Sequence, residues 1–212
     1  MTDYPVALAV EDFVPVALTA TGIALLGGYA DARLGARAGR LTRVAACSVG
    51  AGGLAKAGWK LIVALDGPDV RWLYHALFPL LAIGFTLLAQ ALWDRLPPYL
   101  SAGSLVAALA VSAVIADTWP AMVLTIAAVT VCAVRLLLLA RGDRDRAGAW
   151  LFGIWLAGQY VLGPLAARPD QSVALQWIEQ ACNTLTQGAF AYAAWRLSRS
   201  PRSQTAKEAV TA

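Results

Sequence analysis

The chain has 212 residues, of which 59% are apolar and 14% are charged, and its formal net charge is +4. Ordinary soluble domains are about 45–50% apolar and about 25% charged, so this composition excludes an ordinary soluble globular domain. The mean hydropathy of +0.61 and a series of long apolar runs predict an all-α fold, a polytopic membrane bundle.

Seven apolar runs are each long enough, at about 1.5 Å per residue, to cross a hydrocarbon core about 30 Å thick. In chain order, we expect transmembrane helices at residues 9–29, 43–64, 71–93, 98–117, 119–140, 147–165 and 172–196. The first run begins among acidic residues and no cleavage site stands out, so we expect it to stay in the mature protein. These runs define one transmembrane domain, residues 1–197, and the polar segment 198–212 predicts a disordered cytoplasmic tail.

The distribution of cations predicts the orientation of these helices. Only Arg71 and Arg168 lie on one side, and Lys56, Lys60 and Arg135 lie within spans. The other twelve of the 17 Lys and Arg residues share the opposite side: Arg33, Arg37, Arg40, Arg43, Arg95, Arg141, Arg144, Arg146, Arg196, Arg199, Arg202 and Lys207. By the positive-inside rule we expect a multi-pass protein of the cell membrane, with its N-terminus outside and its C-terminus in the cytoplasm. The positive charge then reflects topology, and we expect no nucleic-acid partner.

The residues that usually bind metals or cofactors are few and scattered. Cys47, Cys132 and Cys182 lie in apolar spans without metal-ligand spacing, and His75 is the single histidine. The chain also has no glycine-rich phosphate loop, zinc motif or Gly-x-Ser-x-Gly elbow. We therefore expect no metal and no cofactor.

When the sequence is compared with itself at a shift of 105 residues, its first half aligns with its second half. The matched pairs include Asp12 and Asp117, Pro15 and Pro120, Gly53 and Gly158, Trp72 and Trp177, and Phe85 and Phe190. They predict that residues 9–93 repeat as residues 117–197, with a connector helix at residues 98–117. A single connector makes the two halves parallel, related by an axis along the membrane normal.

This 3+1+3 plan resembles that of SWEET and PQ-loop carriers, which also place a proline in the first helix of each half. Pro15 and Pro120 match that proline in position, but neither is followed by the glutamine of the PQ motif. Both prolines also have a structural explanation, because the first turn of a helix has no backbone donor to lose.

Polar side chains concentrate in the predicted outer halves of the spans, where ionisable residues are costly and therefore mark candidate sites. Lys56 and Lys60 lie one helical turn apart beside Trp59, and Glu179 and Asn183 lie one turn apart on the seventh span. We expect an outward-facing polar pocket in which Lys60 pairs with Glu179. Its candidate acid–base residues are Glu179, Asp117, Asp12 and Glu11. Its candidate substrate-binding residues are Lys56, Lys60, Trp59, His75, Gln159, Trp177 and Asn183. Further aromatic walls are expected from Trp72, Tyr74, Phe78, Trp155 and Tyr160.

Each of these groups also has a structural explanation. Lysines near a helix end extend to the membrane interface, acidic residues cap helices, and tryptophans gather at membrane interfaces. The small residues from Gly50 to Gly53 permit close helix contact in a homo-oligomer or larger complex, and equally within one bundle.

The pocket residues suit acid–base chemistry on a lipid-like isoprenoid. A carboxylic acid can protonate an alkene or epoxide, and aromatic faces stabilise the resulting cation. The chain resembles the small seven-span terpene cyclases of meroterpenoid and indole-terpenoid biosynthesis in length, span number, orientation and the sequence Ala57-Gly58-Trp59-Lys60. The resemblance implies a terpene cyclase of secondary metabolism that acts on a prenylated small molecule among membrane lipids. The fungal branch of that family has Glu where this chain has Lys60, so only the span-seven carboxylate, Glu179, is carried over.

The alternative function is a membrane carrier for a small polar or anionic solute. Lys56, Lys60 and Glu179 would then bind the solute at one end of a path between the two halves. Few polar residues lie in the inner halves of the spans to line an exit, and a conducting path should be polar along its length. A pocket closed on one side favours an enzyme or a receptor over a carrier.

Overall fold

The computed structural model describes residues 5–166 and 172–200, and every regular element in these ranges is a helix. The helices are α1 (Val6–Glu11), α2 (Phe13–Leu34), α3 (Ala36–Ala64), α4 (Arg71–His75), α5 (Leu77–Leu92), α6 (Pro98–Ile115), α7 (Trp119–Gly142), α8 (Arg146–Ala166) and α9 (Val173–Ser198). The prediction of an all-helical chain is therefore confirmed. The predicted tail lies outside the described residues from position 201 onward.

Two short breaks each divide one helical rod into two helices, and a proline explains each break. Pro15 has no N–H to donate to the carbonyl of Glu11, and α1 ends at Glu11. Pro79 likewise has no N–H to donate to the carbonyl of His75, and α4 ends at His75. Between α2 and α3 the chain turns at Gly35, whose φ of 96° favours glycine.

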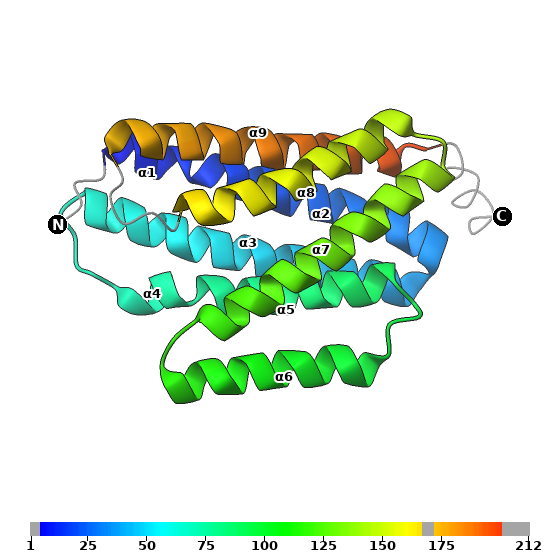
Figure 1. The fold of residues 1–212 in the computed structure, drawn as a ribbon, viewed down its shortest axis with the longest axis horizontal. Helices are drawn as coiled ribbons and strands as arrows, with labels where there is room; N and C mark the ends of the chain where they lie inside the picture. The colour runs from blue at the N-terminus through cyan, green and yellow to red at the C-terminus, as the bar shows by residue number, and fades with distance from the viewer. Residues whose placement is uncertain (1–4, 167–171, 201–212) are drawn as a thin grey trace.

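Successive rods run in alternating directions (Figure 1). We call the end of the bundle where α1 begins and α3 finishes the N-terminal end, and the end where α2 and α9 finish the C-terminal end. α6 and α7 each begin with a proline in the first turn, where no backbone donor is lost.

Six rods form a closed ring of packed neighbours. α2 packs on α3, α3 on α5, α5 on α7, α7 on α8, α8 on α9, and α9 returns to α2. Among the described residues α6 packs mainly on α7 and α5, and Figure 1 shows it at the lower edge of the bundle. Apart from Ser112, α6 has no buried residue, and apolar side chains such as Val106 and Val114 are exposed on its surface.

The ring is filled by a core of apolar side chains that extends to the C-terminal end. Leu26, Leu88, Leu136 and Phe190 are fully buried there. Small residues allow the helices to approach closely: a Cβ on Gly53 would lie 2.7 Å from Val16 of α2, so this glycine packs within one chain.

Four helical rods among the described residues are long and apolar enough to cross a membrane. They are Val6–Leu34, Arg71–Leu92, Pro98–Ile115 and Trp119–Gly142. α3 and α9 are long enough but contain more polar residues, since α3 includes Lys56 and Lys60 and α9 includes Glu179. These four rods are consistent with a membrane location.

Two carboxylates join the helices at the C-terminal end. The Asp143 side chain is fully buried, lies 3.2 Å from Arg33 Nη2, and accepts hydrogen bonds from the hydroxyls of Tyr29 and Ser200. This contact joins α2, the α7–α8 turn and the end of α9.

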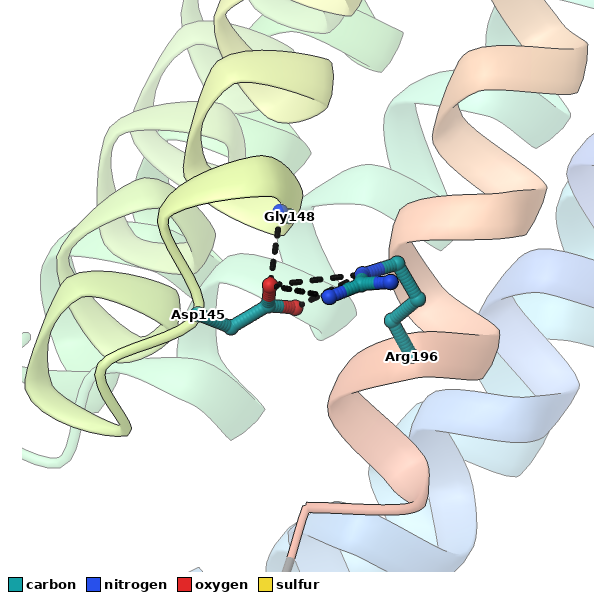
Figure 2. Close-up of polar contacts among 3 residues, drawn as sticks. All are labelled: Asp145, Gly148 and Arg196. Atoms are coloured by element: carbon teal, nitrogen blue, oxygen red, sulfur yellow. Dashed lines mark hydrogen bonds and ion pairs between the residues drawn. The ribbon is translucent and has the colours of Figure 1, made fainter.

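The second carboxylate, Asp145, pairs with Arg196 of α9 (Figure 2). Arg196 donates from Nη2 to Oδ1 at 2.7 Å and from Nε to Oδ2 at 3.2 Å, and the backbone N–H of Gly148 donates to Oδ1 at 3.0 Å. The hydrogen bonds from Arg196, with that from Gly148, hold the pKa of Asp145 below its usual range. Asp145 therefore fastens the start of α8 to α9.

Candidate functional site

A cavity of about 260 Å³ lies in the N-terminal half of the ring, between α2, α3, α5, α8 and α9. Its lining residues are Asp12, Pro15, Val16, Thr19, Val49, Gly53, Lys56, Ala57, Lys60, Leu77, Leu81, Phe85, Trp155, Gln159, Glu179, Gln180, Asn183 and Gln187. On α9, for example, the lining positions recur at intervals of three or four residues, as expected for one face of a helix.

The charged residues of the cavity lie near its N-terminal side. Lys60 Nζ is 2.5 Å from Asp12 Oδ2, and both side chains are mostly buried. Lys56 lies within electrostatic range of Lys60, Asp12 and Glu179, and its Nζ is 5.7 Å from the centre of the Tyr74 ring. The lining thus includes two cations and two anions, so its formal charge is balanced.

A hydrogen-bonded glutamine forms the opposite end of the cavity. Gln187 Oε1 accepts from Thr19 Oγ1 at 3.0 Å and from Trp155 Nε1 at 3.1 Å, while its Nε2 donates to Asn183 Oδ1 at 3.3 Å. Trp155 is 1% exposed and packs 4.4 Å from the Phe190 ring. Behind these residues lies the apolar core, so the cavity is closed toward the C-terminal end.

In two further glutamines the side-chain amide nitrogen has no hydrogen-bond partner in the part of the chain that the structure describes. Gln159 on α8 and Gln180 on α9 both line the cavity. The Nε2 atom of each is buried and has no hydrogen-bond partner among the described residues. Buried donors normally have partners, so these two amides require an explanation.

Six of the residues proposed from the sequence meet in this cavity. They are Asp12, Lys56, Lys60, Gln159, Glu179 and Asn183. Trp155 is the one predicted aromatic wall residue that lines it. Lys56 and Lys60 both line the cavity, and Lys60 forms its ion pair there.

Trp59 and His75 lie together outside the cavity, in a shallow depression between α3 and α4. The Trp59 indole N–H donates to Asp69 Oδ1 at 2.8 Å, and the Trp59 ring is 4.9 Å from that of Tyr74. The hydrogen bond from Trp59, with that from Arg71, lowers the pKa of Asp69 below its usual range. Trp59 thus contacts the loop that precedes α4.

The three remaining predicted residues also lie outside the lining. Glu11 Oε1 accepts a hydrogen bond from Thr184 Oγ1 at 2.5 Å, between α1 and α9. Asp117 is exposed in the α6–α7 turn, and its side chain accepts from the backbone N–H of Trp119, two residues on, at 3.1 Å, as in an Asx turn. Trp177 is 40% exposed.

Sequence reasoning missed Asp12 as a partner of Lys60, along with Thr19 and Phe85 as lining residues. The helix break at Asp12 could have been inferred from Pro15, because the carbonyl four residues before a proline loses its helical donor. Thr19 follows Pro15 by one turn on the same face, and its hydroxyl also donates to the Pro15 carbonyl at 2.8 Å.

No protein-family model, curated protein or solved structure matched this chain. Within the described residues, no group of three His, Cys, Asp or Glu side chains could hold a metal ion. The chemistry of the cavity is therefore the basis for a functional proposal.

Proposed function

We propose that the protein is an integral membrane enzyme that performs acid–base chemistry on a lipid-like isoprenoid substrate, most closely as a terpene cyclase does. The observation that supports this proposal is a cavity, closed toward the C-terminal end, that combines two carboxylates with an aromatic end wall. Asp12 and Glu179 both line it, and so do Trp155 and Phe85. A prenylated small molecule fits this combination of polar and apolar walls.

The two carboxylates receive different roles in this proposal. Glu179 takes up a proton from solvent and transfers it to an alkene or epoxide of the substrate, and the resulting cation closes a ring by forming a carbon–carbon bond. Trp155 and Phe85 stabilise the cation through their ring faces. Asp12, which already forms an ion pair with Lys60, accepts the proton that the cyclised cation loses. The reaction is an isomerisation, because Asp12 releases to solvent the proton that it accepts, so both carboxylates end the cycle as they began it.

Loss of either carboxylate is expected to reduce cyclisation at least about 100-fold, the lower range for positioned acid–base groups. The protein, reconstituted in lipid nanodiscs, would be given prenylated phenols and indoles with and without a terminal epoxide. Chromatography with mass detection would follow a product of unchanged mass and altered retention. Glu179→Gln and Asp12→Asn are compared with the wild type.

Asp94→Asn is the matched control, because Asp94 is exposed at the other end of the bundle. We expect it to retain wild-type activity. Full activity in either Glu179→Gln or Asp12→Asn would contradict the role assigned to that carboxylate. Movement of labelled polar solutes across proteoliposomes, without conversion of any prenylated compound, would show that the alternative carrier function is correct.

A parallel repeat of the two halves is also proposed, and the ring of contacts supports it. If α2, α3 and α5 exchange places with α7, α8 and α9 in that order, each pair of helices in contact in the ring becomes another pair that is in contact. α6 then connects the halves. Such symmetry favours a carrier, whereas the apolar core that the described residues form beyond Trp155 favours an enzyme, because a conducting path should be polar along its length.

We further propose that all seven rods cross the cell membrane, with the cavity in the outer half. The polar residues that make α3 and α9 less apolar line the cavity inside the ring, where they do not meet lipid. The exposed apolar side chains of α6 suit contact with lipid. The cation-rich loops lie at the C-terminal end, which the positive-inside rule places in the cytoplasm.

Cysteine labelling tests this orientation. In a variant without Cys47, Cys132 and Cys182, Asp66→Cys should react with an impermeant maleimide on intact cells. Gly142→Cys should react only after permeabilisation, because the α7–α8 turn is expected to face the cytoplasm. The reverse pattern would contradict the orientation and place the cavity in the inner half of the membrane.

A further inference from the structure

We infer that the cavity recognises an uncharged group with a hydrogen-bond acceptor oxygen, such as a ketone, ester or epoxide, and discriminates against anions. This inference rests on the proposed function and deepens it, because it names the chemical class of the substrate's polar group. The acceptor oxygen is held by Gln159 and Gln180, which approach the cavity from two neighbouring helices.

The buried amide donors provide the first argument. Gln180 is 7% exposed, and its Nε2 has no partner among the described residues, as is also true of Gln159 Nε2. A buried N–H without a partner is costly, and a ligand oxygen would remove that cost. Asn183 Oδ1 accepts from Gln187, so the Nδ2 hydrogens of Asn183 add to the donors on this wall.

The balance of charge provides the second argument. Lys56 and Lys60 are matched in the lining by Asp12 and Glu179, and Lys60 already forms an ion pair with Asp12. An anionic ligand would add a charge without a counter-ion in a site of low dielectric constant, whereas a neutral acceptor would not. The lysines therefore balance the carboxylates and do not form a receptor for a carboxylate or phosphate.

The apolar part of the lining accounts for the rest of the ligand. Val16, Val49, Leu77, Leu81 and Phe85 line the cavity together with the amides. An isoprenoid segment can pack against these side chains while its oxygen contacts the glutamines. A polar head without a hydrocarbon segment would leave this surface uncovered.

Three probes with the same two-isoprene tail test the inference: a methyl ketone, a carboxylate and a hydrocarbon without oxygen. Binding is measured by thermal shift and by titration, in nanodiscs of ether-linked phosphatidylcholine, whose lipids have no ester carbonyl. We expect the ketone to bind at least about tenfold more tightly than the carboxylate. Equal or tighter binding of the carboxylate would overturn the inference.

Gln180→Leu and Gln159→Leu are each expected to weaken ketone binding by about tenfold and to leave hydrocarbon binding unchanged. Neither should lower the melting temperature without ligand, because each removes an unsatisfied buried amide. Gln176→Leu is the matched control, since Gln176 lies one turn earlier on α9, is 92% buried and lies outside the cavity lining. Undiminished ketone binding in both cavity variants would overturn the inference.

The outcomes separate this inference from the proposed function. Ketone binding that depends on Gln180, without conversion of any substrate, would support the inference and contradict the enzyme. Conversion of anionic substrates would support the enzyme and contradict the inference. If ester-linked lipids compete with the ketone, the lipid carbonyl occupies the same neutral-acceptor site, which supports the inference and identifies a lipid as the ligand.

Discussion

Replacement of Asp143 by alanine is expected to lower the free energy of unfolding by about 3–5 kcal/mol. The Asp143 side chain is fully buried, and its partner Arg33 is 30% exposed. Without the carboxylate, the Arg33 guanidinium is left without its counter-ion, and the hydroxyls of Tyr29 and Ser200 lose their acceptor. Thermal and denaturant unfolding of the purified protein in detergent would measure the loss.

A double variant tests whether the loss of stability arises from the unpaired charge or from the change in side-chain volume. Arg33→Met combined with Asp143→Leu should recover most of the lost stability, because uncharged side chains can replace a buried ion pair at little cost. Asp94→Asn, at an exposed carboxylate near the same end, should melt like the wild type. Unchanged melting of Asp143→Ala would show that the Asp143 contacts contribute nothing.

The positions of the helices along the chain were largely predictable from the sequence, because they follow from runs of apolar residues and from prolines. Each predicted span corresponds to one helical rod, as residues 98–117 do to α6, Pro98–Ile115. The sequence did not reveal that α6 lies outside the ring. Its apolar composition resembles that of α7, and only the contacts among helices distinguish the two.

The site was predictable in part, for reasons of helix periodicity. Lys56 with Lys60, and Glu179 with Asn183, share helix faces by their spacing, and these faces line the cavity. Asp12 and Asp117 each lie three residues before a proline, but Asp117 lies in a solvent-exposed turn. The position of an acidic residue along its helix therefore did not predict whether its side chain lines the cavity.

Replacement of Lys60 by methionine is expected both to abolish the proposed activity and to lower the free energy of unfolding by about 2 kcal/mol. Lys60 Nζ lies 2.5 Å from Asp12 Oδ2, with the side chains only 21% and 12% exposed. Loss of the ammonium leaves the Asp12 carboxylate without its ion-pair partner and removes the ion pair that joins α3 to the junction of α1 and α2. The measurements are melting temperature in detergent and cyclisation in nanodiscs.

The double variant Lys60→Met with Asp12→Asn distinguishes a site from a purely structural ion pair. An uncharged pair restores packing without an uncompensated charge, so its melting temperature should approach that of the wild type. Its activity should stay lost, because the carboxylate that accepts the substrate's proton is gone. If the double variant recovers activity along with stability, Asp12 and Lys60 only join α2 to α3, and the proton acceptor must be another residue of the cavity.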